Sequence, residues 1–215
     1  MTFWEYLDSR RALLLAEAGG HAGLVLPCVA AGAVLGVLVG VVAHRGERAA
    51  HLAATAARTL LAVPSLALIG LLVAVLGLGL PPTLTALTFL GLLPVARNTV
   101  RGLHTVGSSP VDAARGLGMS RQVRLLRVEL PLAWPPILDG VRTATRQLTG
   151  IAAVAAYVSA PGLGNEIFRG LTAPDSADAP AQILAGTLGI AALTLLFDAV
   201  LVLLGRLTVR RGRVA

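Results

Sequence analysis

Residues 23–43, GLVLPCVAAGAVLGVLVGVVA, decide the fold, because the stretch is apolar throughout and carries no charged side chain. A helix rises about 1.5 Å per residue, so about 20 residues cross the hydrocarbon core of a bilayer. Further uncharged runs cover 60–88, 148–163 and 183–197. A soluble all-α bundle would alternate such runs with polar faces, and this chain does not. We therefore expect an all-α, polytopic membrane protein.

The composition of the whole chain points the same way. Its 215 residues are 55% apolar and 13% charged, with a mean hydropathy of +0.78. We expect one domain, 1–215, with about five or six transmembrane helices. The five predicted spans are 22–43, 55–78, 83–105, 135–157 and 181–205. The segment 160–172 is short and broken by glycine and proline, so we interpret it as a re-entrant or external loop unless it forms a sixth span.

The first residues support a separate prediction. MTFWEYLDSRRALLLAEA, residues 1–18, mixes aromatic and charged side chains. Aromatic rings favour the level of the lipid headgroups, where Phe3, Trp4 and Tyr6 would hold a helix at the membrane surface. The pattern predicts an amphipathic N-terminal segment over residues 1–20 that lies at the interface.

All 18 basic residues are arginine, and lysine is absent. A P-loop needs a lysine to reach the phosphates of a nucleotide, so the chain has no Walker-type ATPase site of its own. Schiff-base chemistry also needs lysine. The four histidines are scattered without metal-ligand spacing, and no nucleophile stands beside a base in the sequence. We expect no catalytic residue and no metal site in this chain.

The placement of arginine predicts the orientation, because cytoplasmic loops of membrane proteins are rich in basic residues. The 44–58 loop, the 97–131 segment and the C-terminal tail together carry a net charge of +10. The N-terminal segment and the loops after residue 157 carry a net charge of −3. We expect the first set to be cytoplasmic and the N-terminus to be outside. The overall charge of +7 is then a topological signal, since no aromatic-interleaved basic face exists to stack nucleic-acid bases.

Residues 111–131, VDAARGLGMSRQVRLLRVELP, interrupt the apolar runs with a basic stretch punctuated by glycine. The spacing predicts a short helix, a tight turn at Gly118 and a second helix that ends before Pro131. The small side chains of Ala113 and Ala114 would let the first helix sit deep in a groove on another protein. Glycine supplies the bend without steric cost. We interpret the stretch as a cytoplasmic docking element.

The same stretch resembles the EAA motif of the integral membrane subunits of bacterial ABC importers: an acidic residue, two alanines, a glycine and a Leu-Pro pair. Asp112 stands where glutamate is usual, and Val128 stands where isoleucine is common. The resemblance implies that residues 110–120 form a coupling helix, within a cytoplasmic loop over 107–131, that sits in a cleft of an ATPase. The implied ATPase-coupling residues are Asp112, Ala113, Ala114, Gly118, Leu130 and Pro131.

The resemblance extends over nearly the whole chain. The similar segments are VPSLALIGLLVAVLGLGLPP (63–82), LLPVARNTVRGL (92–103), GVRTATRQ (140–147) and APGLGNEIFRGL (160–171). They resemble the permeases for glycine betaine, carnitine and choline, which implies a type I ABC importer domain of MetI-like fold that carries a quaternary-ammonium osmoprotectant. An ABC importer of amino acids or another small solute is the alternative within this class. A secondary transporter or channel is the alternative outside it.

An assembly in the bacterial cytoplasmic (inner) membrane is also implied by the resemblance. It comprises two cytoplasmic ATPase subunits that bind ATP and Mg²⁺, a second permease subunit, identical or paralogous, and an extracytoplasmic substrate-binding protein. The permease itself binds no cofactor and contacts lipid. Only 4% of its residues are aromatic. Because quaternary ammonium groups bind in aromatic cages, we expect the binding protein to perform most of the selection.

Within the spans, Pro64 should kink the second helix and free a carbonyl beside Ser65. Both are candidates for the translocation path, together with Asn98 and Tyr157, although a purely structural kink is equally compatible with the sequence.

Charges and glycines within the spans support two packing predictions. Charge is costly inside a membrane, so we expect Asp198 to pair with Arg142 or Arg146 in a structural role. Glycines recur every four residues in the first span and form a flat strip for close helix packing, which we assign to contacts within one subunit, with a contact between two subunits as the alternative. The strip consists of Gly32, Gly36 and Gly40.

Overall fold

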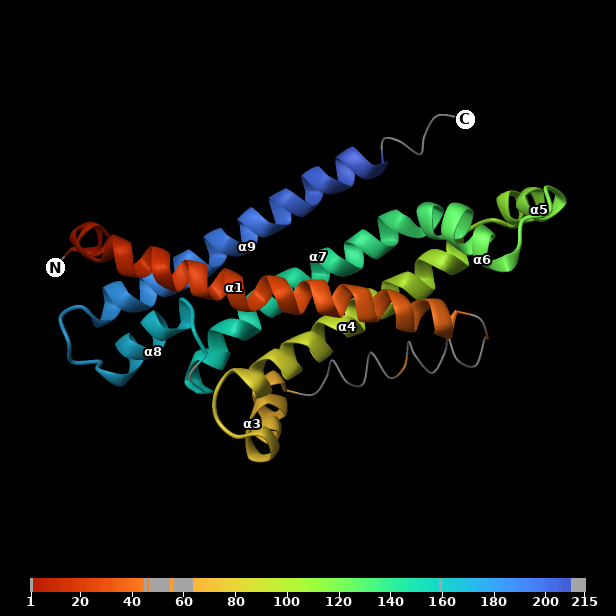
Figure 1. The fold of residues 1–215 in the computed structure, drawn as a ribbon. Helices are drawn as coiled ribbons and strands as arrows, with labels where there is room; N and C mark the ends of the chain where they lie inside the picture. Colours follow the sequence, from red (N-terminus) through yellow and green to blue (C-terminus); the bar gives the residue numbers. More distant parts are fainter. Residues whose placement is uncertain (1, 45, 47–54, 56–63, 159, 210–215) are drawn as a thin grey trace.

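The computed structural model of the chain describes residues 2–44, 46, 55, 64–158 and 160–209 (Figure 1). Every regular element in these ranges is helical, which confirms the all-α prediction. The long helices are α1 (Phe3–Ala43), α4 (Leu80–Thr105), α7 (Leu130–Ala155) and α9 (Ala179–Val209). The short ones are α3 (Ser65–Leu76), α5 (Ser108–Gly116), α6 (Arg121–Arg124) and α8 (Gly164–Thr172).

Helix α4 lies between α1 and α7, and the three helices build the core. The glycine strip of α1 faces α4. A Cβ atom added to Gly36 would lie 2.7 Å from the Cβ of Val95, and one added to Gly40 would lie 2.5 Å from the Cβ of Thr99. Real Cβ contacts are longer, so only glycine permits this approach of the two backbones. The strip therefore packs within the subunit, as predicted.

A buried apolar cluster joins these helices to α3. Its largest fully buried members are Val25 of α1, Ile69 of α3, Leu87 of α4 and Leu148 of α7. Helix α9 contributes little to this core, because only 6% of its most apolar stretch is buried inside the chain. Exposed leucine is costly in water and suits the hydrocarbon of a bilayer.

Three of the five predicted spans, in α1, α4 and α9, are long and apolar enough to cross a membrane. Helix α7 has 26 residues, but it carries Asp139, Arg142 and Arg146. Helix α3 has only 12 residues, or about 18 Å. The remainder of the predicted 55–78 span includes residues 56–63, which lie outside the described ranges.

The N-terminal segment is not a separate interfacial helix, because α1 continues without a break from Phe3 to Ala43. Thr2 and Glu5 form a reciprocal capping box at its start. Trp4 is exposed, as expected for an interfacial ring, but Tyr6 is buried against Ala181 and Ala185 of α9. Because Tyr6 packs on α9, the first turns of α1 continue the helix of the span instead of forming a separate surface helix.

The helices run between two ends of the molecule (Figure 1). One end, which we call the α5 end, carries α5, α6 and the end of α1 at His44. The other, the α8 end, carries α8, the start of α1 and the start of α9. The basic 107–131 segment lies at the α5 end, whereas Glu17 and Glu166 lie at the α8 end, so the structure separates the charges as the sequence predicts.

Candidate functional site

Helix α5 ends in a tight turn centred on Gly118. The backbone N–H of Met119 donates to the carbonyl of Ala114 (3.1 Å), and the N–H of Gly118 donates to that of Arg115 (2.9 Å). This pair of bonds is a Schellman motif, which requires a left-handed residue after the helix cap. Gly118 supplies it with a φ of 75°. The predicted short helix and glycine turn are therefore confirmed.

The predicted coupling residues of α5 do not share one face. Asp112 and Ala113 are exposed, whereas Ala114 is buried within the chain. The Asp112 carboxylate lies 3.2 Å from the guanidinium of Arg115, one helical turn further along. Leu117 is 77% exposed at the tip of the turn. Asp112, Ala113 and Leu117 therefore belong to the outward surface of the element, and the sequence interpretation did not include this leucine.

The prediction that the second helix ends before Pro131 is wrong. Helix α6 runs into a π-helical turn over Leu125–Glu129 and then directly into α7. The N–H of Leu130 donates to the carbonyl of Leu125, five residues back. Proline lacks an N–H and its ring crowds the carbonyl four residues earlier, so a wider turn just before Pro131 relieves that conflict. Leu130 and Pro131 thus begin α7, which follows α6 through the π turn without a loop.

The charged residues of the spans form the predicted pair. Arg142 of α7 donates to both carboxylate oxygens of Asp198 of α9, at 3.0 Å each. Arg146 lies 3.7 Å from the same carboxylate, and Asp139 lies 3.6 Å from Arg142. A two-point guanidinium–carboxylate contact fixes geometry as well as charge. The cluster therefore ties the sparsely packed α9 to α7.

The four candidate path residues are spread over the fold. Pro64 immediately precedes α3 and does not kink a helix interior, since its ψ of 124° is non-helical and the helix begins at Ser65. The Asn98 side chain donates to the carbonyl of Pro94 (2.8 Å) and lies beside Gly140 of α7. Tyr157 follows α7 and is 73% exposed. No hydrogen bond joins any two of these four described residues.

A polar cluster at the α8 end went unrecognised in the sequence. Glu166 of α8 is fully buried, accepts a hydrogen bond from Tyr6 (2.5 Å) and pairs with Arg169. Arg169 also reaches Glu17 of α1 at 3.0 Å. Glu17 accepts further bonds from the Gly162 backbone (3.2 Å) and the Asn165 side chain (3.1 Å).

This cluster fastens the 160–172 segment to α1. With nine residues, or about 14 Å, α8 is too short to cross the hydrocarbon. The available sequence signal was the occurrence of Glu and Arg three residues apart in an otherwise apolar, glycine-rich segment. A buried carboxylate needs a partner, but the identity of the partners on α1 depends on how the chain folds back.

Comparison with known proteins places this geometry in a family. Residues 32–210 match the family described as binding-protein-dependent transport system inner membrane component. The chain is 31% identical over 207 residues to the glycine betaine/carnitine/choline transport system permease protein OpuCB of Bacillus subtilis, covering 96% of this chain and 94% of that protein. It is 36% identical over 183 residues to the osmoprotectant import permease protein OsmW of Salmonella typhimurium, covering 83% of each.

A solved structure shares the fold. The MetNI methionine ABC transporter, in an inward-facing conformation, contains a chain that matches with a TM-score of 0.79 at 18% identity, covering 94% of this chain and 98% of that one. The match confirms the MetI-like architecture predicted from the sequence. The chain therefore belongs to the family of binding-protein-dependent transport system inner membrane components, the permease subunits of ABC transporters.

Proposed function

We propose that this chain is the permease subunit of an ATP-driven importer of quaternary-ammonium osmoprotectants and that α5 couples it to a separate ATPase. The observation that carries the proposal is the α5 element itself, a short helix closed by the Gly118 turn at the basic end of the molecule. Such a rigid, exposed element can transmit a rigid-body motion of a bound subunit into the spans. ATP and Mg²⁺ belong to the ATPase, since this chain contains no lysine for a P-loop.

Direct continuity of α6 with α7 supports this coupling. Because the π turn joins them without a loop, a displacement of α5 and α6 would move α7. Helix α7 in turn holds α9 through the Arg142–Asp198 pair. In the assembly we propose, two such permeases, identical or paralogous, stand above two ATPases in the bacterial inner membrane. A substrate-binding protein docks at the α8 end, with the N-terminus outside and the C-terminus cytoplasmic.

Two observations support the substrate class. Relatives over most of the chain are named for glycine betaine, carnitine and choline, or for osmoprotectants. In this chain, the rings of Tyr157 and Phe168 lie 5.8 Å apart at the α8 end. Aromatic faces attract quaternary ammonium groups. Two rings are few for a complete cage, so the binding protein performs most of the selection and the permease offers a passage lined partly by these rings.

The test is uptake of labelled glycine betaine, carnitine and choline in cells whose own osmolyte importers are deleted, with the complete system expressed. We expect saturable uptake that is abolished by a catalytically inactive ATPase. Tyr157→Leu should reduce uptake several-fold by removing the ring face, whereas Tyr157→Phe should retain it, because cation–π attraction requires no hydroxyl.

Competition distinguishes the alternative substrates. If an excess of amino acids abolishes osmolyte uptake, or if only amino acids are transported, the chain serves an amino-acid importer. Uptake that persists with the inactive ATPase would indicate a secondary transporter instead and would contradict the proposal.

A further inference from the structure

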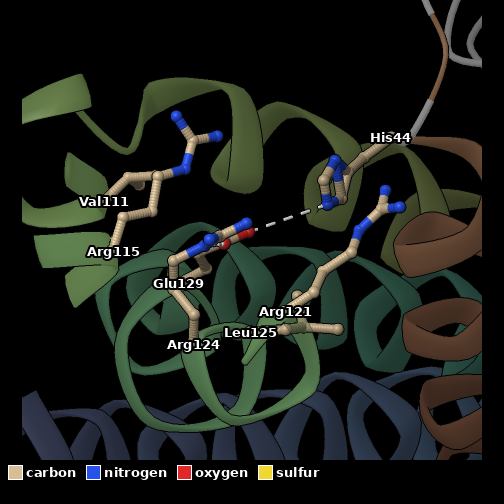
Figure 2. A pocket seen from close by; sticks show the side chains of 7 residues that line it. All are labelled: His44, Val111, Arg115, Arg121, Arg124, Leu125 and Glu129. Carbon is tan, nitrogen blue, oxygen red and sulfur yellow. Dashed lines mark hydrogen bonds and ion pairs between the residues drawn. The ribbon is translucent and has the colours of Figure 1, made fainter. Parts of the chain in front are cut away.

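A pocket of about 240 Å³ lies at the α5 end, between α5, α6, the π turn and the end of α1 (Figure 2). Such a volume holds several waters or one four-oxygen phosphate group. Its lining residues are His44, Val111, Arg115, Arg121, Arg124, Leu125 and Glu129. We call this site the arginine pocket.

The lining of the arginine pocket is strongly basic. The only carboxylate among its described lining residues, Glu129, is already bound by Arg124 at 2.9 Å and lies 3.9 Å from His44. Arg115 pairs only with the exposed Asp112 outside the lining, and Arg121 has no ion-pair partner among the described residues. In the view of Figure 2, the guanidinium group of Arg121 lies beside His44, and that of Arg115 lies beyond the Glu129 end of the dashed line. Among the described lining residues, positive charge therefore exceeds negative charge.

Guanidinium groups are well suited to phosphate. Each presents a planar fork of N–H donors that matches two phosphate oxygens, and guanidinium is less strongly hydrated than an ammonium group. Arg115 of α5 and Arg121 and Arg124 of α6 line one partly open hollow, so more than one guanidinium is available to a phosphate there, which a single exposed arginine on a loop would not provide. A phosphate entering the pocket would reduce the repulsion among the arginines.

We infer the level of the pocket in the membrane from Trp134. Trp134, on α7, donates its indole N–H to Thr208 of α9 at 2.9 Å and remains partly exposed. Tryptophan favours the boundary between hydrocarbon and headgroups. Glu129 lies five residues before Trp134, about 7 Å further along the helix axis. That displacement reaches the polar layer, which extends about 5–7 Å beyond the hydrocarbon on each side.

We propose that the arginine pocket binds a phosphate group, either that of an anionic lipid headgroup or free phosphate. The proposal goes beyond transport and rests only on the insertion of this chain in a membrane, so it can fail or succeed independently of the substrate class. Because the pocket lies between α5 and the π turn that leads into α7, a bound phosphate would brace the coupling element against the spans.

Phosphatidylglycerol and inorganic phosphate are the probes. The intact transporter is placed in nanodiscs of phosphatidylcholine with graded phosphatidylglycerol, and native mass spectrometry counts the retained phosphatidylglycerol. In discs of phosphatidylcholine alone, inorganic phosphate is titrated by calorimetry. The test variant is Arg121→Gln. The matched control is Arg127→Gln, because Arg127 is an exposed arginine of the adjoining π turn that does not line the pocket.

We expect Arg121→Gln to weaken retention of one phosphatidylglycerol per permease about tenfold, in line with the loss of a charge-assisted contact, while Arg127→Gln behaves as wild type. If phosphate also binds in an Arg121-dependent way and displaces the lipid, free phosphate is the ligand and the pocket assignment stands. Retention equal to wild type in Arg121→Gln, or no retention by wild type, overturns the proposal. Arg121→Gln could also lose ATPase copurification in phosphatidylcholine while its lipid and phosphate binding stay unchanged. That result would overturn the proposal and indicate that the pocket binds a carboxylate of the ATPase.

Discussion

Gly118 shows how much of the coupling element depends on a single residue. Its φ of 75° lies in the left-handed region, and a Cβ added there meets no atom within 4 Å. The need for glycine is therefore conformational within this chain. A β-branched residue at such an angle costs about 1–3 kcal/mol. We predict that Gly118→Val leaves membrane insertion intact but lowers ATPase copurification and uncouples hydrolysis from transport.

The control for this prediction is Gly118→Asn, because asparagine tolerates the left-handed region. It should retain both copurification and substrate-stimulated hydrolysis in reconstituted membranes. If Gly118→Val also behaves as wild type in both measurements, α5 is not the coupling element.

At the scale of elements, the packing of α1 on α4 depends on the absence of side chains. We predict that Gly36→Ala destabilises the permease by about 1–3 kcal/mol, because its Cβ would lie 2.7 Å from that of Val95 and the core cannot absorb it without strain. Thermal unfolding in detergent, followed by circular dichroism, measures the change.

Gly23 offers the matched control on the same helix. A Cβ added there meets nothing within 4 Å. Gly23→Ala should therefore leave the midpoint unchanged or raise it slightly, since alanine favours helix over glycine by about 1 kcal/mol. If Gly36→Ala and Gly23→Ala had the same midpoint of thermal unfolding, the stability of the permease would not depend on the close packing of α1 on α4.

For the whole molecule, the separation of charge between the two ends predicts the orientation in the membrane. Ser109 at the α5 end and Ser176 at the α8 end are both exposed. In a Cys28→Ala background, we expect an impermeant maleimide added to intact cells to label Ser176→Cys and not Ser109→Cys. Cys28 is buried and is the sole native cysteine, so its removal clears the background.

Permeabilised cells supply the positive control, because both cysteines should then react. Labelling of Ser109→Cys from outside, without labelling of Ser176→Cys, would show that the orientation is the reverse of the predicted one. It would also place α5 where no cytoplasmic ATPase could reach it.

What the sequence alone determined is what depends on local chemistry. Uncharged runs require helices in a bilayer, because every backbone polar group must be satisfied there. The spacing from Asp112 to Gly118 indicated the cap of α5, since a Schellman turn requires a left-handed residue at a fixed position. The predicted Arg142–Asp198 pair followed from the cost of isolated charge in a membrane.

Only the tertiary structure decided which distant groups meet. The amphipathic N-terminal residues are part of α1, because Tyr6 packs on α9 and donates a hydrogen bond to Glu166, which is 160 positions away in the sequence. The tertiary structure buried Ala114 while leaving Ala113 exposed, and it carried α6 through Pro131 by widening the preceding turn. Periodicity and composition indicate which side chains of a segment must be buried or paired. Which residue of another segment contacts them depends on the packing of the helices, and the pattern of one segment does not encode that packing.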